Sequence, residues 1–189
     1  MTEQEAPTED PRPVGLRNAE SLVLVLTGNG KGKSSSAFGM VVRAIARDWK
    51  VAVVQFIKSG DWLAGEQKVG ERLGVTWLAL GAGFTWDSDD LEHDKAIARD
   101  AWKQAADLIA SGDFDLVVLD EITYLPMWNW IPVSSVVDSI ANRPSHVNVI
   151  CTGRDAPNEL IEIADTVTSM TNVKHAYDSG IAAKRGIDF

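Results

Sequence analysis

The sequence predicts an α/β fold in which a mostly parallel sheet carries helices on both faces, and three observations support this prediction. Short runs of consecutive apolar residues alternate along the chain with segments whose apolar residues recur at helical spacing. The runs lack a regular polar position, which is typical of parallel strands buried on both faces. The chain has 189 residues, 45% of them hydrophobic and 24% charged, so it can bury a sizeable core. We therefore expect residues 21–189 to form a single domain.

The strands are predicted from the apolar runs, taken in chain order. The first run, residues 22–26, is entirely apolar, and the later runs are rich in the β-branched residues that pleated sheets favour. The expected strands are residues 22–26, 51–56, 75–80, 116–119, 147–151 and 166–170. Ligand sites in parallel sheets lie outside the carboxyl ends of the strands, so the residues that follow each run are the candidates for function.

The helices are predicted from the segments between the runs. In the first of them, residues 35–47, apolar residues recur at Ala37, Met40, Val41, Ala44 and Ile45, which places them on one helical face. The same reasoning predicts helices at residues 65–73, 90–110, 133–141 and 158–164. Each helix then connects two neighbouring strand runs, as a parallel sheet requires.

Residues 1–20 have a different composition from the rest of the chain. This segment carries Pro7, Pro11 and Pro13 among Glu and Thr residues and has few apolar side chains, so it cannot bury enough surface to fold alone. It lacks the apolar core of a secretion signal and the arginine-rich pattern of a transit peptide. We expect a flexible N-terminal arm, either a solvated tail or a flap that orders over a bound ligand.

The turn between the first strand and the first helix has the composition of a phosphate-binding loop, Thr27-Gly28-Asn29-Gly30-Lys31-Gly32-Lys33-Ser34. Glycines allow backbone N–H groups to point at a phosphate, Lys33 can reach the phosphate oxygens, and the Ser34 hydroxyl can bind Mg²⁺. The pattern G-x-x-x-x-G-K-[ST] expects its first glycine at position 27, whereas the chain has Thr27 there and the glycine one residue later. The loop is therefore shortened, and the alternative to a nucleoside triphosphate site is a glycine- and lysine-rich surface turn.

Charged residues follow two of the later strands. Asp120 and Glu121 come directly after the apolar run 116–119, where P-loop proteins hold Mg²⁺ or orient a water. The alternative is a pair of surface acids. Arg154 follows the run 147–151, and its guanidinium matches phosphate oxygens, although an arginine in a surface turn has the same spacing.

Large aromatic residues occupy the loop after the third strand. Phe84 and Trp86 stand among glycines in residues 81–87, and Trp128 and Trp130 also follow a strand. Rings of this size either form an apolar face for a ligand or fold back and pack on the protein core. Residue type alone does not separate these two interpretations.

Composition excludes several classes of function. The formal net charge is −9 and the isoelectric point is near 4.8, which argues against an electrostatic nucleic-acid binder. No apolar run reaches membrane-spanning length, and the single cysteine, Cys151, lies among apolar neighbours and suits a buried, inert thiol. His93, His146 and His175 lack metal-ligand spacing. We expect a cytoplasmic protein that uses neither nucleic acid nor a membrane.

Several segments together resemble the cobalamin-pathway ATP:corrinoid adenosyltransferases, and the resemblance spans residues 22–189. The shortened phosphate loop is itself characteristic of that family. The other segments that carry the resemblance are Val54-Gln-Phe-Ile-Lys58, Gly83-Phe-Thr-Trp86, Val118-Leu-Asp-Glu-Ile-Thr-Tyr124, Cys151-Thr-Gly-Arg154, Val173-Lys-His-Ala-Tyr-Asp178 and Gly186-Ile-Asp-Phe189. The resemblance implies a P-loop (RecA-like) nucleotide-binding fold.

The resemblance also implies a reaction. Such enzymes transfer the 5′-deoxyadenosyl group of ATP to the Co(I) centre of a corrinoid and release inorganic triphosphate, in adenosylcobalamin biosynthesis or salvage. ATP lies in reversed polarity relative to other P-loop enzymes, and a reduced flavin or flavoprotein supplies electrons. The family's catalysts are usually homodimers that require Mg²⁺.

Individual residues take roles from this resemblance. Phe84 and Trp86 match the aromatics that press against the lower face of the corrin and displace the axial ligand of cobalt. Ser34 and Glu121 match the Mg²⁺ positions, with Asp120 as a weaker candidate. The positions matched to nucleotide binding are Gly28, Asn29, Gly30, Lys31, Gly32, Lys33, Ser34, Ser35, Arg43 and Arg154.

Two other classes of function remain open on the residues alone. A conventional P-loop ATPase or kinase would also use Lys33, Ser34 and the acidic pair, and it would release ADP. A regulatory module that binds ATP only to change shape would bind without turnover.

Overall fold

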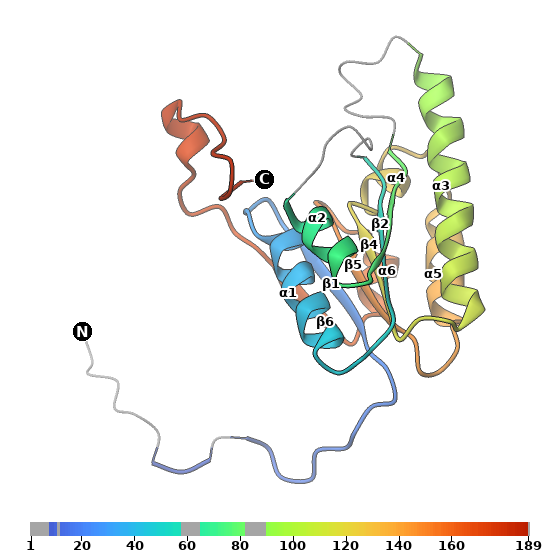
Figure 1. Ribbon diagram of the computed structural model, residues 1–189, viewed down its shortest axis with the longest axis vertical. Coiled ribbons are helices and arrows are strands. Elements are labelled where there is room, and N and C mark those ends of the chain that lie inside the picture. The colour runs from blue at the N-terminus through green and yellow to red at the C-terminus, as the bar shows by residue number, and fades with distance from the viewer. Residues whose placement is uncertain (1–7, 11, 58–64, 82–89, 189) are drawn as a thin grey trace.

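A computed structural model describes residues 8–10, 12–57, 65–81 and 90–188, and its centre is a sheet of six parallel strands (Figure 1). Neighbouring strands follow the order β3-β2-β4-β5-β1-β6. The strands are β1 Val23–Thr27, β2 Val51–Gln55, β3 Thr76–Ala79, β4 Leu116–Asp120, β5 Asn148–Thr152 and β6 Thr166–Ser169. All six predicted strands are therefore confirmed, with differences of at most one residue at each end.

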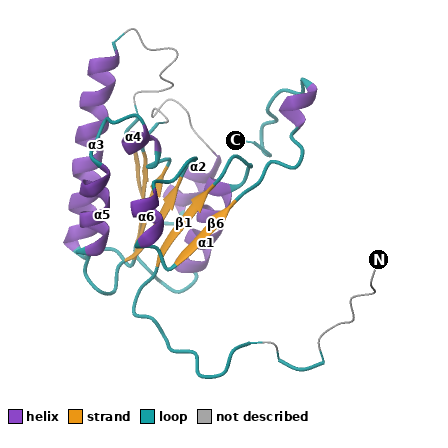
Figure 2. Cartoon of the chain, turned by 180° about the vertical axis from the view of Figure 1, so that it is seen from behind, coloured by secondary structure: helices purple, strands orange, loops and turns teal. Residues whose placement is uncertain are grey.

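Helices connect these strands and cover both faces of the sheet (Figures 1 and 2). The elements are α1 Lys33–Ile45, α2 Gly65–Arg72, α3 Leu91–Ser111, α4 Tyr124–Met127, α5 Val133–Ala141, α6 Asn158–Glu162 and the short 3₁₀ helix η2 Ala176–Ser179. The five expected helices are present, and α1 begins at Lys33 rather than at residue 35. The sequence analysis missed α4 and η2, since four residues are too few to show helical periodicity.

Alternate residues of strands β1 to β5 enter two separate cores, whereas β6 is exposed along its length. On one face, Leu26, Val53 and Val118 pack under α1, and Trp77 of β3 closes this core beside α2. On the other face, the neighbouring strand residues pack under α3, α5 and α6. The predicted α/β architecture is confirmed, and the continuous apolar runs are explained by burial on both sides.

The two ends of the chain lie outside this core. Residues 8–10 and 12–20 are exposed and form neither helix nor strand, and Figure 1 shows them leading away from the sheet. At the other end, the chain after β6 continues into η2 and stands beyond the carboxyl edge of the strands. In the described part of the chain, no helix has the length and apolar character needed to cross a membrane.

Candidate functional site

The phosphate loop connects β1 to α1, as its sequence predicts. Gly28 and Gly32 have φ angles of 90° and 114°, in the left-handed region that glycine adopts without strain. Lys33 is the first residue of α1, and its Nζ donates hydrogen bonds of 2.8 Å to the carbonyl oxygens of Gly28 and Gly30. The lysine therefore folds back over its own loop, so that its ammonium lies where the loop surrounds an anion.

The segment after β6 supports this loop from one side. Gly30 N–H donates to the carbonyl of Met170 at 2.7 Å, and Met170 N–H donates to the carbonyl of Thr27 at 2.8 Å. A Cβ added to Gly30 would lie 2.8 Å from the backbone of Thr171, and one added to Gly28 would lie 2.5 Å from the Met170 carbonyl oxygen. Glycine is thus required by the close approach of another backbone, which the loop sequence alone does not reveal.

Charged groups from the ends of two strands, β4 and β5, act on Lys33. Burial lowers the pKa of its half-buried ammonium, and the positive charge of Arg154 lowers it further. Glu121, Asp120 and Asp155 act in the opposite direction. The two cations near the loop suit a ligand with several negative charges, because such a ligand would relieve their mutual repulsion.

The acidic pair follows β4 as predicted, but its two members have different environments. Asp120 is completely buried, and its carboxylate accepts hydrogen bonds from Thr152 Oγ1 at 2.7 Å and from Gln55 Nε2 at 3.0 Å. Glu121 is partly exposed and has a left-handed φ of 65°. Of the two acids, Glu121 is thus the one open to solvent, while Asp120 is held inside the sheet edge. The metal roles of Glu121 and, more weakly, of Asp120 stay predictions.

Two polar residues at this edge, Gln55 and Thr152, were missed by the sequence analysis. Thr152 also accepts the backbone N–H of Glu121 at 2.9 Å, and Gln55 Oε1 accepts the indole N–H of Trp77 at 3.0 Å. A usable signal was present, since Gln55 and Thr152 are polar residues that directly follow at least three consecutive apolar residues of their strands. Their position at the carboxyl ends of the strands could have identified them as candidate site residues.

Arg154 lies in the tight turn after β5. Thr123 Oγ1 donates to the Arg154 carbonyl at 2.7 Å, and Gly153 has a φ of 143° with the Thr123 hydroxyl packed where its Cβ would be. The Arg154 side chain is exposed, and its charge acts on Lys33. The structure therefore brings Arg154 to the phosphate loop.

The remaining nucleotide candidates divide between the site and the rest of α1. Ser34 is partly buried and Ser35 is exposed in the first turn of α1, and Asn29 lines a cavity of about 580 Å³ beside the loop. Arg43 lies in the last turn of α1, ten residues after Lys33, which is about 15 Å along a helix axis. The structure therefore does not bring Arg43 to the loop, and Arg43 instead lines a groove with Leu22.

Lys31 contacts the carboxyl-terminal segment rather than its own loop. Its Nζ lies 2.6 Å from Asp188 Oδ1. Because of this hydrogen bond, and of a second one from the Lys184 N–H, the pKa of the Asp188 carboxyl lies below its usual value. The carboxyl-terminal segment therefore meets the phosphate loop.

The aromatic residues after β4 pack on one another. The rings of Tyr124 and Trp128 have centroids 5.0 Å apart, and so do the rings of Trp128 and Trp130. Trp130 is buried in the core under α3, while Tyr124 is half-buried, and this burial raises the pKa of its hydroxyl. Phe84 and Trp86 fall outside the described residues.

The described residues suit a Mg²⁺ ion only in combination with a bound nucleotide. Among them there is no group of three or more His, Cys, Asp or Glu side chains that could hold a metal. Mg²⁺ binds through one or two protein ligands together with phosphate oxygens and water. The Glu121 carboxylate and the Ser34 hydroxyl are oxygen donors of the kind that this mode of binding uses.

Comparison with known proteins gives matches over almost the whole chain. Residues 19–189 match the family described as ATP:corrinoid adenosyltransferase BtuR/CobO/CobP. A corrinoid adenosyltransferase of Pseudomonas aeruginosa is 45% identical over 182 residues, which cover 95% of this chain and 89% of the relative. A corrinoid adenosyltransferase of Escherichia coli K12 is 41% identical over 180 residues, which cover 95% of this chain and 91% of the relative. The corrinoid adenosyltransferase CobA of Salmonella typhimurium is 39% identical over 180 residues, with the same coverage.

Proposed function

This chain belongs to the ATP:corrinoid adenosyltransferase family, and we infer from this membership that it is an enzyme that transfers the adenosyl group of ATP to a corrinoid. The observation that carries the inference is the family match over residues 19–189, which includes every element of the sheet. The phosphate loop, Lys33 and Glu121 supply the nucleotide side of such a site.

The chemistry assigned to the site is a displacement at carbon. The Co(I) centre of the substrate gives two electrons to the 5′-carbon of ATP, a cobalt–carbon bond forms, and the bond from this carbon to oxygen breaks. The electrons of that bond leave with inorganic triphosphate. The phosphates are thus the leaving group, and the protein accelerates the step by stabilising the charge that grows on the departing oxygen.

The residues around the phosphate loop are arranged for this task. Backbone N–H groups of the loop and the N-terminus of α1 favour negative charge, and the ammonium of Lys33 would exchange its bonds to the Gly28 and Gly30 carbonyls for phosphate oxygens. Arg154 adds a second cation. Glu121 and the Ser34 hydroxyl would hold Mg²⁺, which neutralises charge on the triphosphate when bound.

The corrinoid side of the proposal rests on residues outside the described ranges. We propose that Phe84 and Trp86 pack against the lower face of the corrin and exclude the axial ligand of cobalt. Without that ligand, Co(I) is favoured relative to Co(II), so an apolar face eases reduction. A reduced flavin or flavoprotein is the proposed electron donor.

The organisation of the protein completes the proposal. Residues 21–189 would act as one catalytic domain in a cytoplasmic homodimer, with residues 1–20 as an arm able to close over the corrinoid. The exposure of residues 12–20 leaves this arm free to move.

An anaerobic assay with ATP, Mg²⁺ and chemically reduced cob(I)alamin tests the function. We expect loss of the Co(I) absorbance together with adenosylcorrinoid and intact triphosphate. Phe84→Ala and Trp86→Ala should slow the reaction with a protein-bound Co(II) corrinoid and a reductant more than the reaction with preformed Co(I). Lys33→Met should abolish transfer, and Lys50→Met, at an exposed lysine that precedes β2, serves as its control.

The products decide between this function and a conventional ATPase or kinase. ADP or orthophosphate without alkylation of cobalt would overturn the adenosyltransferase assignment. ATP binding without any turnover would also overturn it.

A further inference from the structure

Four hydrogen bonds at the carboxyl edge of the sheet form a chain that ends at Asp120. Trp77 Nε1 donates to Gln55 Oε1 at 3.0 Å, and Gln55 Nε2 donates to Asp120 Oδ2 at 3.0 Å. From the other side, the Glu121 N–H donates to Thr152 Oγ1 at 2.9 Å, and Thr152 Oγ1 donates to Asp120 Oδ1 at 2.7 Å. The carboxylate of Asp120 therefore accepts the last hydrogen bond from each side.

The chemistry of each group fixes the direction of these bonds. An indole N–H can only donate, so the Gln55 amide must turn its oxygen to Trp77 and its NH₂ to Asp120. A hydroxyl has one proton to give. Thr152 gives that proton to Asp120 and therefore accepts from the backbone of Glu121.

The chain of bonds lies beneath the phosphate loop. Gln55 pairs with Asp120 across β2 and β4, and Thr152 ends the next strand, β5. These three residues continue the alternation of Val53, Val118 and Ile150, so they lie on the face that α1 covers. All three are at most 1% exposed, which makes a lost hydrogen bond costly.

The hydrogen bond to Thr152 comes from the backbone of Glu121, the proposed metal ligand. Glu121 has a φ of 65°, in the left-handed region that a residue with a Cβ adopts only at a cost. Such a conformation persists only where neighbouring groups hold it, and the 2.9 Å bond from its N–H to Thr152 is one such constraint. The orientation of the Glu121 peptide therefore depends on the Thr152 hydroxyl.

We propose that Thr152 and Gln55 are positioning residues for the metal–nucleotide site. Thr152 joins the buried carboxylate of Asp120 to the backbone of Glu121, and Gln55 holds the other oxygen of that carboxylate. Together they keep the Glu121 side chain where it meets a divalent cation bound to ATP. This inference rests on the proposed role of Glu121 in holding Mg²⁺.

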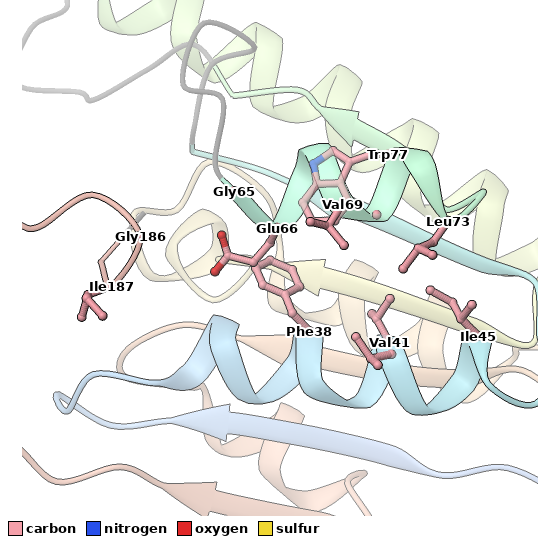
Figure 3. Close-up of a pocket in the computed structure, with 12 residues that line it drawn as sticks. Phe38, Val41, Ile45, Gly65, Glu66, Val69, Leu73, Trp77, Gly186 and Ile187 are labelled. Atoms are coloured by element: carbon pink, nitrogen blue, oxygen red, sulfur yellow. The ribbon is translucent and has the colours of Figure 1, made fainter.

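Trp77 extends the same series of hydrogen bonds to β3, the strand on the other edge of β2 from β4. Its ring packs on Phe38 with centroids 5.2 Å apart and lines an apolar groove of about 420 Å³ between α1 and α2 (Figure 3). The indole is thus held by packing while its N–H fixes the Gln55 amide. Trp77→Phe keeps an aromatic ring in this place but removes the N–H donor and part of the indole, so we expect it to act in the same direction as a Gln55 variant but less strongly.

The test compares ATP affinity with Mn²⁺ and with EDTA, measured by calorimetry on the whole chain without a corrinoid. The gain in affinity on adding Mn²⁺ reports how well the protein holds the metal. Thr152→Val keeps the shape of the side chain and removes the hydroxyl. We expect it to reduce the Mn²⁺-dependent gain by about tenfold, as loss of groups that orient metal ligands typically does, and to leave affinity in EDTA within about twofold. Thr152→Ser should restore the gain.

Two further variants keep the test decisive. Gln55→Met has a side chain of similar length without hydrogen-bonding groups, and it should also reduce the Mn²⁺-dependent gain. It therefore replaces Thr152→Val in the test if that variant does not fold. Thr166→Val makes the same change as Thr152→Val at an exposed position of β6 and should leave both affinities unaltered.

Three results would overturn the inference. The wild type could show no gain with Mn²⁺, Thr152→Val could retain the full gain, or it could lose affinity equally with Mn²⁺ and with EDTA, as a purely structural role predicts. The assay contains no corrinoid. A Thr152-dependent gain in a protein that forms no adenosylcorrinoid would therefore overturn the proposed function and leave this inference standing.

Discussion

The Lys31 ammonium and the Asp188 carboxylate form an ion pair of 2.6 Å that joins the phosphate loop to the carboxyl-terminal segment. The Asp188 carboxylate also accepts the Lys184 N–H at 2.7 Å, so it belongs to a turn of its own. A negative charge is thus held beside a loop whose proposed ligand is a polyanion.

Replacement of Asp188 by asparagine should strengthen ATP binding. Removal of the carboxylate leaves the charge of Lys31 uncompensated, and we expect ATP to bind about two- to threefold more tightly at low ionic strength. The difference should vanish in 1 M salt, where charges are screened beyond about 3 Å. Calorimetric titration with ATP at both salt concentrations measures it, and Asp178→Asn, on the same segment, is the control. Equal affinity of the Asp188 variant and the wild type at low salt would contradict this prediction.

Two glycine-to-alanine substitutions should have opposite effects on stability. Gly30→Ala would place a Cβ 2.8 Å from the Thr171 backbone, so we expect a lower thermal midpoint and at least tenfold weaker ATP binding. Gly39 lies in α1, and a Cβ added there meets nothing within 4 Å. Gly39→Ala should therefore stabilise the protein by about 0.5–1 kcal/mol and leave ATP affinity unchanged. Thermal unfolding and ATP titration of both variants provide the check, and a similar response of the two would exclude the backbone contact as the cause.

The lowered pKa of Lys33 should make ATP binding sensitive to alkaline pH. Its ordinary value is 10.5, and burial followed by repulsion from Arg154 lowers it. Phosphate binding requires the ammonium, so ATP affinity should fall as the pH rises through the lowered pKa, earlier than for an ordinary lysine. Bound phosphates favour the charged form, so ATP binding should take up a proton in that range. Titrations in buffers of different ionisation enthalpy measure this uptake, and Lys33→Met should abolish it. Uptake that persists in Lys33→Met would assign the proton to another group.

The single cysteine should be inert in the native protein. Cys151 is completely buried in β5, and burial raises the pKa of its thiol to about 12. Because the thiolate is the reactive species, a thiol reagent such as DTNB should label the protein only after denaturation in guanidinium. Rapid labelling of the native chain would show that β5 opens readily to solvent.

The fold follows from the sequence because strands buried on both faces leave a clear signature. The apolar runs that became β1, β2, β4 and β5 are largely buried, and few other elements hide consecutive apolar residues so completely. The edge strand β6 is exposed along its length and carries a weaker signature. The ends of the elements were less certain. Lys33 begins α1 although it belongs to the loop motif, because a helix can start at any residue whose backbone N–H groups face an anion site.

The site was only partly predictable, for a physical reason. Lys33, Ser34 and Glu121 are recognisable because their chemistry follows from local motifs. The contacts that position them come from distant segments, such as Met170 against Gly30, and these depend on the order of strands in the sheet. Arg43 shows the converse, since its match to a family position gave no information on its place at the far end of α1.

The position of β1 has a consequence for how this chain acquires its structure. The first strand made during synthesis lies between β5 and β6, the last two strands of the sheet. Residues 23–27 therefore have no neighbouring strand until residues 148–169 have left the ribosome. Contacts between segments so far apart in sequence slow folding, and the glycine loop cannot be fixed before Met170 arrives. Nascent chains that end before β5 should therefore be unable to retain ATP, and β1 needs protection from aggregation until β5 and β6 have been made.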